Sequence, residues 1–204
     1  LFSPSALLKR LSDRMQILTG GPRDLPSRLQ TMRDAIQWSY DLLNPEEQLA
    51  FRRLALFSGS FSLDVAMEIT GHDGLDILEG VSSLLDKSLV HRLDSDDGTS
   101  RFRMLETIRE FGLIMLHETG DYADASRRFR DFYARLSKAS ILALVGPDQT
   151  AWMGNLDDEV SNLRLAMDMA LEQGDPTDTS GLHIATGLWR YWLSRGLISE
   201  GYDW

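Results

Sequence analysis

The candidates for metal ligands in this 204-residue chain are its four histidines and the run of carboxylates at 157–159. A metal site needs such residues to converge at set spacings. Residues 157–159 read Asp-Asp-Glu, and acidic residues at the start of a helix complement its dipole. We therefore interpret this run as a helix start rather than as a cation site or a catalytic pair. The histidines have no paired spacing, which indicates surface or interface positions and no metal site: His72, His91, His117 and His183.

The sequence also lacks the short motifs of phosphate binding and of nucleophilic catalysis. Neither G-x-x-x-x-G-K-[ST] nor G-x-G-x-x-G occurs, and there is no G-x-S-x-G nucleophile elbow. The Gly20-Gly21 pair is followed by Pro22, which has no N–H to offer a phosphate, so this stretch is interpreted as a hinge. We predict that the chain is not an enzyme in its own right.

A basic cluster in the second half of the chain has two interpretations. The arginines lie on a predicted helix whose other face carries Phe129, Phe132 and Leu136. A solvated helix face is favoured over a partner-binding patch, since charged residues opposite an apolar stripe are typical of a surface helix. The cluster consists of Arg127, Arg128, Arg130 and Arg135.

Helices are expected to position most of these residues, beginning in the first quarter of the chain. A short helix over 4–11 and a turn-rich linker over 19–26 are predicted first. Apolar residues three or four apart predict a helix over 29–43. Asn44, three residues before Glu47, predicts the N-cap and capping box of the next helix.

Two further helices and a β-hairpin are predicted after that. Ser62 is expected to start one helix, which Gly71 ends. Strand-like residues over 88–93 and 101–104 flank the strong turn 94–98, which predicts a hairpin. Helices, a hairpin and a closing helix form the order of a winged-helix unit, with the hairpin as the wing. The helix before the hairpin is expected to start at Asp73 and to carry Leu75, Leu78, Val81 and Leu85.

Beyond Gly120 the chain is expected to be helical throughout. Turns rich in Gly, Asp and Pro separate three predicted helices, which favours antiparallel hairpins of the tetratricopeptide-like kind. No clean 34-residue repeat is present. For a group of aromatic residues, core packing against the next hairpin is favoured over ligand stacking: Trp189, Tyr191 and Trp192. Apolar periodicity marks the second of these helices by Leu156, Val160 and Leu163, and the third by Leu182, Leu188 and Trp192.

Composition and charge restrict the classes of partner. The formal net charge is −10, whereas a protein that binds the phosphate backbone normally presents a basic face. The longest apolar runs are far short of the roughly 20 residues that cross a bilayer. Without cysteine no disulfide framework is possible, and a cytoplasmic location is expected. The predicted recognition helix is acidic, so direct DNA binding is not expected: it carries Asp73, Asp76, Glu79 and Asp86 against Lys87.

Several segments, in order, resemble the region that follows the nucleotide-binding core in STAND-type (NB-ARC-like) ATPases. More narrowly, they are similar to the large LuxR-family and AfsR/SARP-like transcriptional regulators. The chain begins with Leu1 rather than Met, and we expect it to be an internal piece of a longer protein. The segments are ILTGGPRDLP (17–26), WSYDLL (38–43), FRRLALFSGSF (51–61), LLDKSLV (84–90), FRMLETIREFG (102–112) and WRYWLSRGLISEG (189–201).

The resemblance implies a modular switch. It places the end of a small helical domain and a hinge at 1–28, a winged-helix domain at 29–119, and the start of a helical sensor domain at 120–204. An upstream P-loop domain would bind ATP or ADP, and an inducer or protein partner would bind the helical repeats. In this family the winged helix folds onto the nucleotide domain in the ADP-bound form.

The same resemblance singles out the junction between the wing and the helix after it. Many relatives carry a histidine there, within a Met-His-Asp-like motif, that touches the β-phosphate of ADP. The matching triplet is Met104-Leu105-Glu106, and leucine can donate no hydrogen bond. Arg103 is the neighbouring residue that could take over such a contact, so the nucleotide-facing candidates are Arg103, Met104 and Leu105.

The expected fold is therefore mainly α, with a winged helix that contains one β-hairpin, followed by tetratricopeptide-like helical hairpins. The expected function is regulatory: a winged helix that does not bind DNA couples the nucleotide state of an upstream domain to a helical sensor. Two alternatives remain open, namely a protein–protein interaction scaffold and a DNA-binding winged helix.

Overall fold

The computed structural model describes residues 27–71, 74–94, 100–173 and 177–204. The chain divides into two compact units, Leu1–Leu42 and Leu43–Trp204. In the first unit the described part is helix α2 (Ser27–Asp41), as the apolar periodicity predicted. The short helix predicted over 4–11 and the linker predicted over 19–26 lie outside the described residues.

The second unit begins with helix α3 (Pro45–Leu54), which starts at a complete capping box. Asn44 Oδ1 accepts from the Glu47 N–H at 2.9 Å, and Glu47 Oε2 accepts from the Asn44 N–H at 2.9 Å. Two of the N–H groups that a helix start leaves without helical partners are satisfied in this way. The predicted N-cap is confirmed.

Helix α4 (Leu63–Thr70) is the next helix and also starts where the sequence predicted. Ser62 is its N-cap and its Oγ accepts from the Val65 N–H at 3.3 Å. Gly71 is the C-cap.

Helix α5 (Ile77–Asp86) corrects the fourth predicted helix. Asp76 is its N-cap, with Oδ1 accepting from the Glu79 N–H at 3.0 Å, so the predicted start at Asp73 is wrong. An aspartate three residues before a glutamate is the stronger capping pair, and Asp76-Glu79 supplies it. The shifted start also changes which face is buried. Leu78 is 59% exposed, whereas Ile77, Val81 and Leu84 are buried.

The wing consists of β2 (His91–Asp94) and β3 (Ser100–Arg103), which pair antiparallel and confirm the predicted hairpin. A third strand, β1 (Phe61–Ser62), was not predicted. It pairs antiparallel with β3, so that the strand order is β1-β3-β2. Two residues are too short for an alternating pattern to appear in the sequence, and only pairing with β3 defines this strand.

Helix α6 (Glu106–Glu118) closes the winged helix and packs on α3. A Cβ added at Gly112 would lie 2.6 Å from the Ala55 Cβ, so the two helices approach too closely for a side chain there. The Phe51 and Phe111 rings pack beside this contact with centroids 6.2 Å apart.

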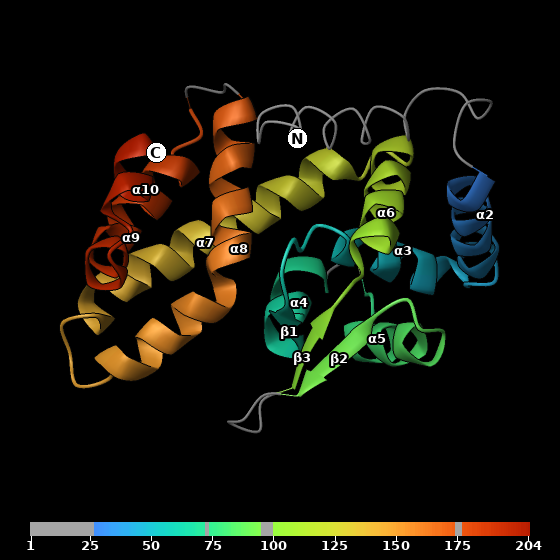
Figure 1. Ribbon diagram of the computed structural model, residues 1–204, viewed down its shortest axis with the longest axis horizontal. Helices are drawn as coiled ribbons and strands as arrows, with labels where there is room; N and C mark the ends of the chain where they lie inside the picture. Colours follow the sequence, from blue (N-terminus) through green and yellow to red (C-terminus); the bar gives the residue numbers. More distant parts are fainter. Residues whose placement is uncertain (1–26, 72–73, 95–99, 174–176) are drawn as a thin grey trace, which may run out of the picture. The chain divides into compact units, whose positions relative to one another are not determined.

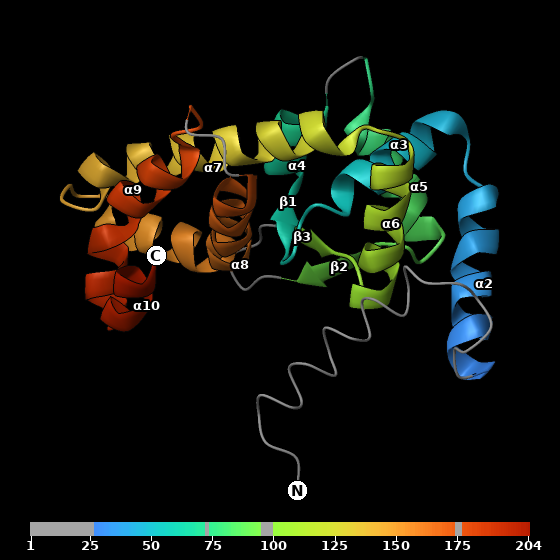
Figure 2. The ribbon, with the colours of Figure 1, turned by 90° about the horizontal axis from the view of Figure 1, so that it is seen from above.

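The helical region comprises α7 (Tyr122–Ala143), α8 (Gln149–Gln173), α9 (Ser180–Arg195) and α10 (Ile198–Asp203). Figures 1 and 2 show α9 lying beside α7, and α9 contacts both α7 and α8. A Cβ at Gly187 would lie 2.3 Å from the Ser137 carbonyl oxygen, so the backbones of α7 and α9 are in direct contact. The mainly helical fold with a winged helix is as predicted.

The apolar faces of the helical region differ from prediction at two positions. Leu182 is 65% exposed, and Ile184 is buried in its place on α9. Tyr191 and Trp192 are buried as expected. Trp189 is 47% exposed, with the Arg190 guanidinium carbon 4.3 Å from its ring centroid, so the predicted core packing is wrong for this residue. Among the residues that the structure describes, no helix is long and apolar enough to cross a membrane.

Candidate functional site

The residues predicted to face a nucleotide lie where the wing meets α6. Arg103 ends β3 and is exposed, Met104 is 4% exposed, and Leu105 is the N-cap residue of α6 and 54% exposed. The Leu105 carbonyl accepts from the N–H groups of Ile108 and Arg109 at 3.0 and 2.9 Å. The extended backbone therefore turns Arg103 and Leu105 outward and Met104 into the core.

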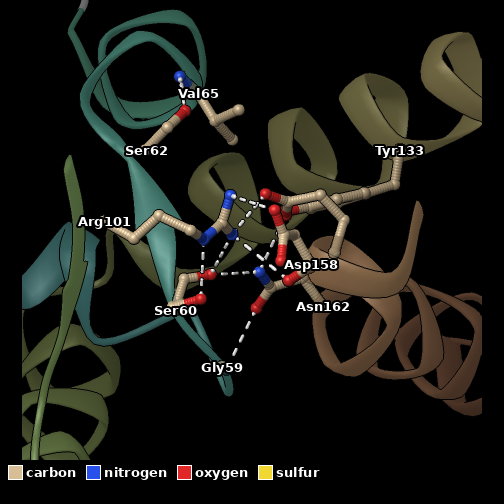
Figure 3. A network of polar contacts seen from close by, with 9 residues as sticks. Gly59, Ser60, Ser62, Val65, Arg101, Tyr133, Asp158 and Asn162 are labelled. Carbon is tan, nitrogen blue, oxygen red and sulfur yellow. Dashed lines mark hydrogen bonds and ion pairs between the residues drawn. The ribbon is translucent and has the colours of Figure 1, made fainter. Parts of the chain in front are cut away.

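A second group of polar residues, which sequence reasoning missed, is buried between the wing and the helical region (Figure 3). We call it the wing junction. Arg101 comes from β3, Ser60 directly precedes β1, Tyr133 comes from α7, and Glu159 and Asn162 come from α8. Five side chains from four parts of the chain thus converge at one point.

Arg101 makes the charged contact of the wing junction. Its Nη2 donates to Glu159 Oε1 at 2.6 Å and to the Ser60 carbonyl at 2.9 Å, and its Nε donates to Ser60 Oγ at 2.8 Å. The guanidinium thereby connects the wing strand, the loop before β1 and helix α8. A planar group with several fixed donors suits such a three-way contact better than a lysine ammonium.

The second carboxylate oxygen of Glu159 is also satisfied. Tyr133 Oη donates to Glu159 Oε2 at 2.6 Å, and Asn162 Nδ2 donates to the same oxygen at 3.0 Å. Asn162 Nδ2 reaches the Ser60 carbonyl at 2.9 Å, and Asn162 Oδ1 accepts from the Gly59 N–H at 3.1 Å. Every polar side chain of the wing junction therefore has a partner from a different element.

Burial makes these contacts energetically important. The side chains of Arg101 and Glu159 are only 11% and 6% exposed, and Tyr133 and Asn162 are fully buried. Burial and the nearby Glu159 charge raise the pKa of Tyr133, so the phenol keeps its proton and remains a hydrogen-bond donor. Removing one partner of a buried ion pair leaves an uncompensated charge, which costs about 3–5 kcal/mol. The arrangement holds the wing and the helical region together.

The interpretation of the acidic run 157–159 as a helix start is therefore wrong. It lies in the middle of α8, where Glu159 shares the buried face with Leu156 and Leu163. The sequence did carry a signal for the burial of Glu159. This residue lies three residues after Leu156 and four before Leu163, which places its carboxylate within an apolar stripe. Asp157 points elsewhere and pairs with Arg195 and Tyr191 of α9.

The arginine cluster divides between surface and interior. Arg127 and Arg128 bind Asp124 on the surface at 2.6 and 2.8 Å, and their hydrogen bonds lower the pKa of Asp124 to about 2. Arg130 is buried instead and pairs with Asp178 at 2.9 Å, so the solvated-face interpretation is wrong for this residue. Arg135 is exposed and pairs with Glu68 of α4 at 2.6 Å.

The three described histidines, His91, His117 and His183, form no metal centre among the described residues. No group of three or more His, Cys, Asp or Glu side chains that could hold an ion occurs among the described residues. His117 instead stacks on Tyr122, with ring centroids 3.7 Å apart. His72 lies outside the described residues.

Comparison with known proteins identifies the first part of the second unit. Residues 43–117 match the family profile of the winged helix-turn-helix domain. These residues form a winged helix-turn-helix domain. The match covers α3 to α6 with the wing, and it falls within the domain predicted over 29–119, whose outer boundaries stay a prediction.

Curated relatives extend the similarity to the helical region. The chain is 36% identical over 205 residues to the Mycobacterium tuberculosis protein named "Putative HTH-type transcriptional regulator Rv0890c", covering 99% of this chain. A Mycobacterium bovis protein with the corresponding name, Mb0914c, matches equally. "Uncharacterized protein Rv0894" of M. tuberculosis is 31% identical over 132 residues, which is 63% of this chain and 33% of its own length. The chain spans 23% of the length of the two named regulators, and no solved structure matches it significantly.

Proposed function

We propose that the chain is a regulatory segment of a transcription regulator, in which the winged helix-turn-helix domain couples the helical region to the residues that follow the wing. The wing junction is the observation that supports this proposal. Arg101 is held by Glu159 of α8, and it stands two residues before Arg103 on the same strand. A strand is a stiff connection over this distance, so a displacement of α8 would move the start of α6.

Acidic residues on the recognition helix support a role other than DNA binding. Asp76, Glu79 and Asp86 of α5 and its cap are exposed, as is Leu78. Phosphates would be repelled by this face, whereas DNA-binding helices carry Arg or Lys toward the backbone. The winged helix in this proposal is a transmitting element, and DNA binding would belong to another part of the longer regulator.

We further propose that the wing-to-helix junction responds to nucleotide binding elsewhere in the longer protein. An upstream P-loop domain in the same protein would bind ATP or ADP, and Arg103 and Leu105 are the outward-facing residues at the junction. Arg103 could donate hydrogen bonds to a phosphate, and Leu105 could only pack. Partner or inducer binding at the helical region would then alter nucleotide affinity through the wing junction.

The first experiment tests DNA binding directly. Fluorescence anisotropy of labelled duplex DNA, titrated with the chain at low salt, is expected to show no binding. Salt-sensitive binding would overturn the proposal and favour a DNA-binding winged helix. Asp76→Lys and Glu79→Lys would then strengthen DNA binding, because each adds positive charge that attracts phosphates.

The second experiment tests the coupling in the longer protein. ADP affinity is measured for Arg103→Ala, for Leu105→Ala, and for Arg190→Ala as a surface control in α9. We expect Arg103→Ala to weaken ADP binding and the control to leave it unchanged. Unchanged affinity in both junction variants would remove the wing-to-helix junction from the mechanism and leave an interaction scaffold as the better function.

A further inference from the structure

A cavity of about 540 Å³ opens between α7, the end of α8 and the start of α9. Its volume lies within the roughly 300–1,000 Å³ that is typical of small-molecule sites. Ala134 is the one apolar side chain among the described lining residues. Such a lining does not suit a hydrophobic ligand. It also distinguishes this cavity from an ordinary packing defect, which is lined by apolar side chains.

Basic side chains dominate the lining of this cavity. Arg127, Arg130, Arg135 and Lys138 line it together with two carboxylates, Asp131 and Asp178. The chain as a whole has a net charge of −10, so this concentration of cations is local.

The cations differ in how firmly they are held. Arg130 is fixed by the buried pair with Asp178, whereas the Arg127 and Arg135 side chains are 55% and 62% exposed in their pairs. Exposed pairs of this kind contribute little to stability, so both arginines can turn to a ligand at little cost. Lys138 forms no hydrogen bond or ion pair with any residue that the structure describes.

Groups from the start of α9 line the cavity as well. Asp178 Oδ1 accepts from the Ser180 N–H at 2.8 Å, and its Oδ2 accepts from Arg130 Nε at 2.9 Å. Asp178 therefore orients both the helix start and the buried guanidinium. Ser180 is 5% exposed, so this helix start is held from within the protein. His183, one turn further along α9, also lines the cavity.

We infer that this cavity binds a small phosphorylated molecule. A phosphate group carries up to two negative charges and several acceptor oxygens, which match the guanidinium and ammonium donors of the lining. The cavity is larger than a phosphate alone needs, and its polar lining fits a hydrophilic remainder such as a sugar. This inference does not depend on the role proposed for the winged helix, because the cavity lies wholly within α7 to α9.

Isothermal titration calorimetry on the 204-residue chain tests the inference with four probes: inorganic phosphate, ribose 5-phosphate, ribose and succinate. Saturable binding of both phosphorylated probes is expected, tighter for ribose 5-phosphate, with no binding of ribose. Lys138→Gln is expected to weaken binding about tenfold, because it removes one charge-assisted hydrogen bond. Arg190→Gln is the matched control, since it removes a positive charge on α9 outside the cavity.

Four results would overturn the inference. The first three are absence of saturable binding of both phosphorylated probes at millimolar concentration, equal binding by Lys138→Gln and the wild type, and an equal loss in Arg190→Gln. Lys138 is exposed and its loss breaks no described contact, so the variant is expected to fold. Unchanged thermal unfolding verifies this. The fourth is equal affinity for succinate and for ribose 5-phosphate. This result would show that the cavity does not select a phosphate group over a dicarboxylate.

Discussion

The guanidinium of Arg101 lies 2.6 Å from the carboxylate of Glu159, although 58 residues separate them in the sequence. This ion pair joins the wing strand to the middle of α8, and both side chains are almost fully buried. The winged helix-turn-helix domain and the helical region are therefore connected by a specific polar contact as well as by apolar packing such as that of Phe57 on Phe129.

Arg101→Ala is expected to lower the free energy of unfolding by about 3–5 kcal/mol, because it leaves the Glu159 carboxylate buried without its cation. Arg103→Ala is the matched control on the same strand, and its exposed position predicts a change within about 0.5 kcal/mol. Urea unfolding followed by circular dichroism measures both. Equal effects of the two substitutions would show that the Arg101–Glu159 pair contributes little.

Tyr133→Phe removes only the hydroxyl that donates to Glu159 Oε2. We expect a loss of about 1.5–3 kcal/mol, the range for hydrogen bonds to charged groups. Tyr191→Phe serves as a comparison, because its hydroxyl donates to the exposed Asp157 at 3.0 Å and should matter less. A larger loss for Tyr191→Phe than for Tyr133→Phe, measured by thermal or urea unfolding, would contradict this ranking.

Two glycines of the helical region should respond to alanine in opposite directions. Gly187→Ala places a Cβ 2.3 Å from the Ser137 carbonyl and forces α7 and α9 apart, which should cost at least about 2 kcal/mol. Gly154 in α8 has open space around the added methyl group. Gly154→Ala should stabilise by roughly 0.5–1 kcal/mol, because alanine loses less backbone entropy in a helix. Destabilisation by both substitutions to the same extent would argue against the close approach.

Glu47 should make stability depend on pH in the acid range. The pKa of Glu47 is held below its ordinary value of 4.5 by hydrogen bonds from the Ser83 side chain, the Asn44 N–H and the Lys87 ammonium. A carboxylate with a lowered pKa contributes stability that is present above pH 4.5 and is lost as the pH falls through its value in the folded protein.

Glu47→Gln should therefore flatten the decline of unfolding free energy below pH 4.5. Ser83→Ala removes the largest cause of the shift and should make the decline smaller, because the pKa of Glu47 in the folded protein then lies closer to its ordinary value. Urea unfolding at a series of pH values measures both effects. An acid decline in Glu47→Gln that is as steep as in the wild type would show that other carboxylates determine it.

Short-range signals in the sequence were sufficient for much of the fold. The Asn44–Glu47 capping box, the Ser62 cap and the wing hairpin were predicted because each depends on residues only a few positions apart. The same reasoning failed by three residues at α5, where two aspartates competed for the cap and Asp76 had the better-placed glutamate. Strand β1 was missed because it is defined by its pairing with β3 rather than by its own two residues.

By itself the sequence determined the local elements, their order and the absence of nucleophile and phosphate-loop motifs, since these depend on neighbouring residues. Which charges are buried was decided only by the tertiary structure. Asp157, Asp158 and Glu159 are adjacent and chemically alike, yet only Glu159 is buried against Arg101, whereas the exposed Asp158 carboxylate lies 4.0 Å from the same guanidinium. A buried carboxylate is stable only where distant elements supply its partners, and no local pattern specifies that β3, α7 and α8 meet there.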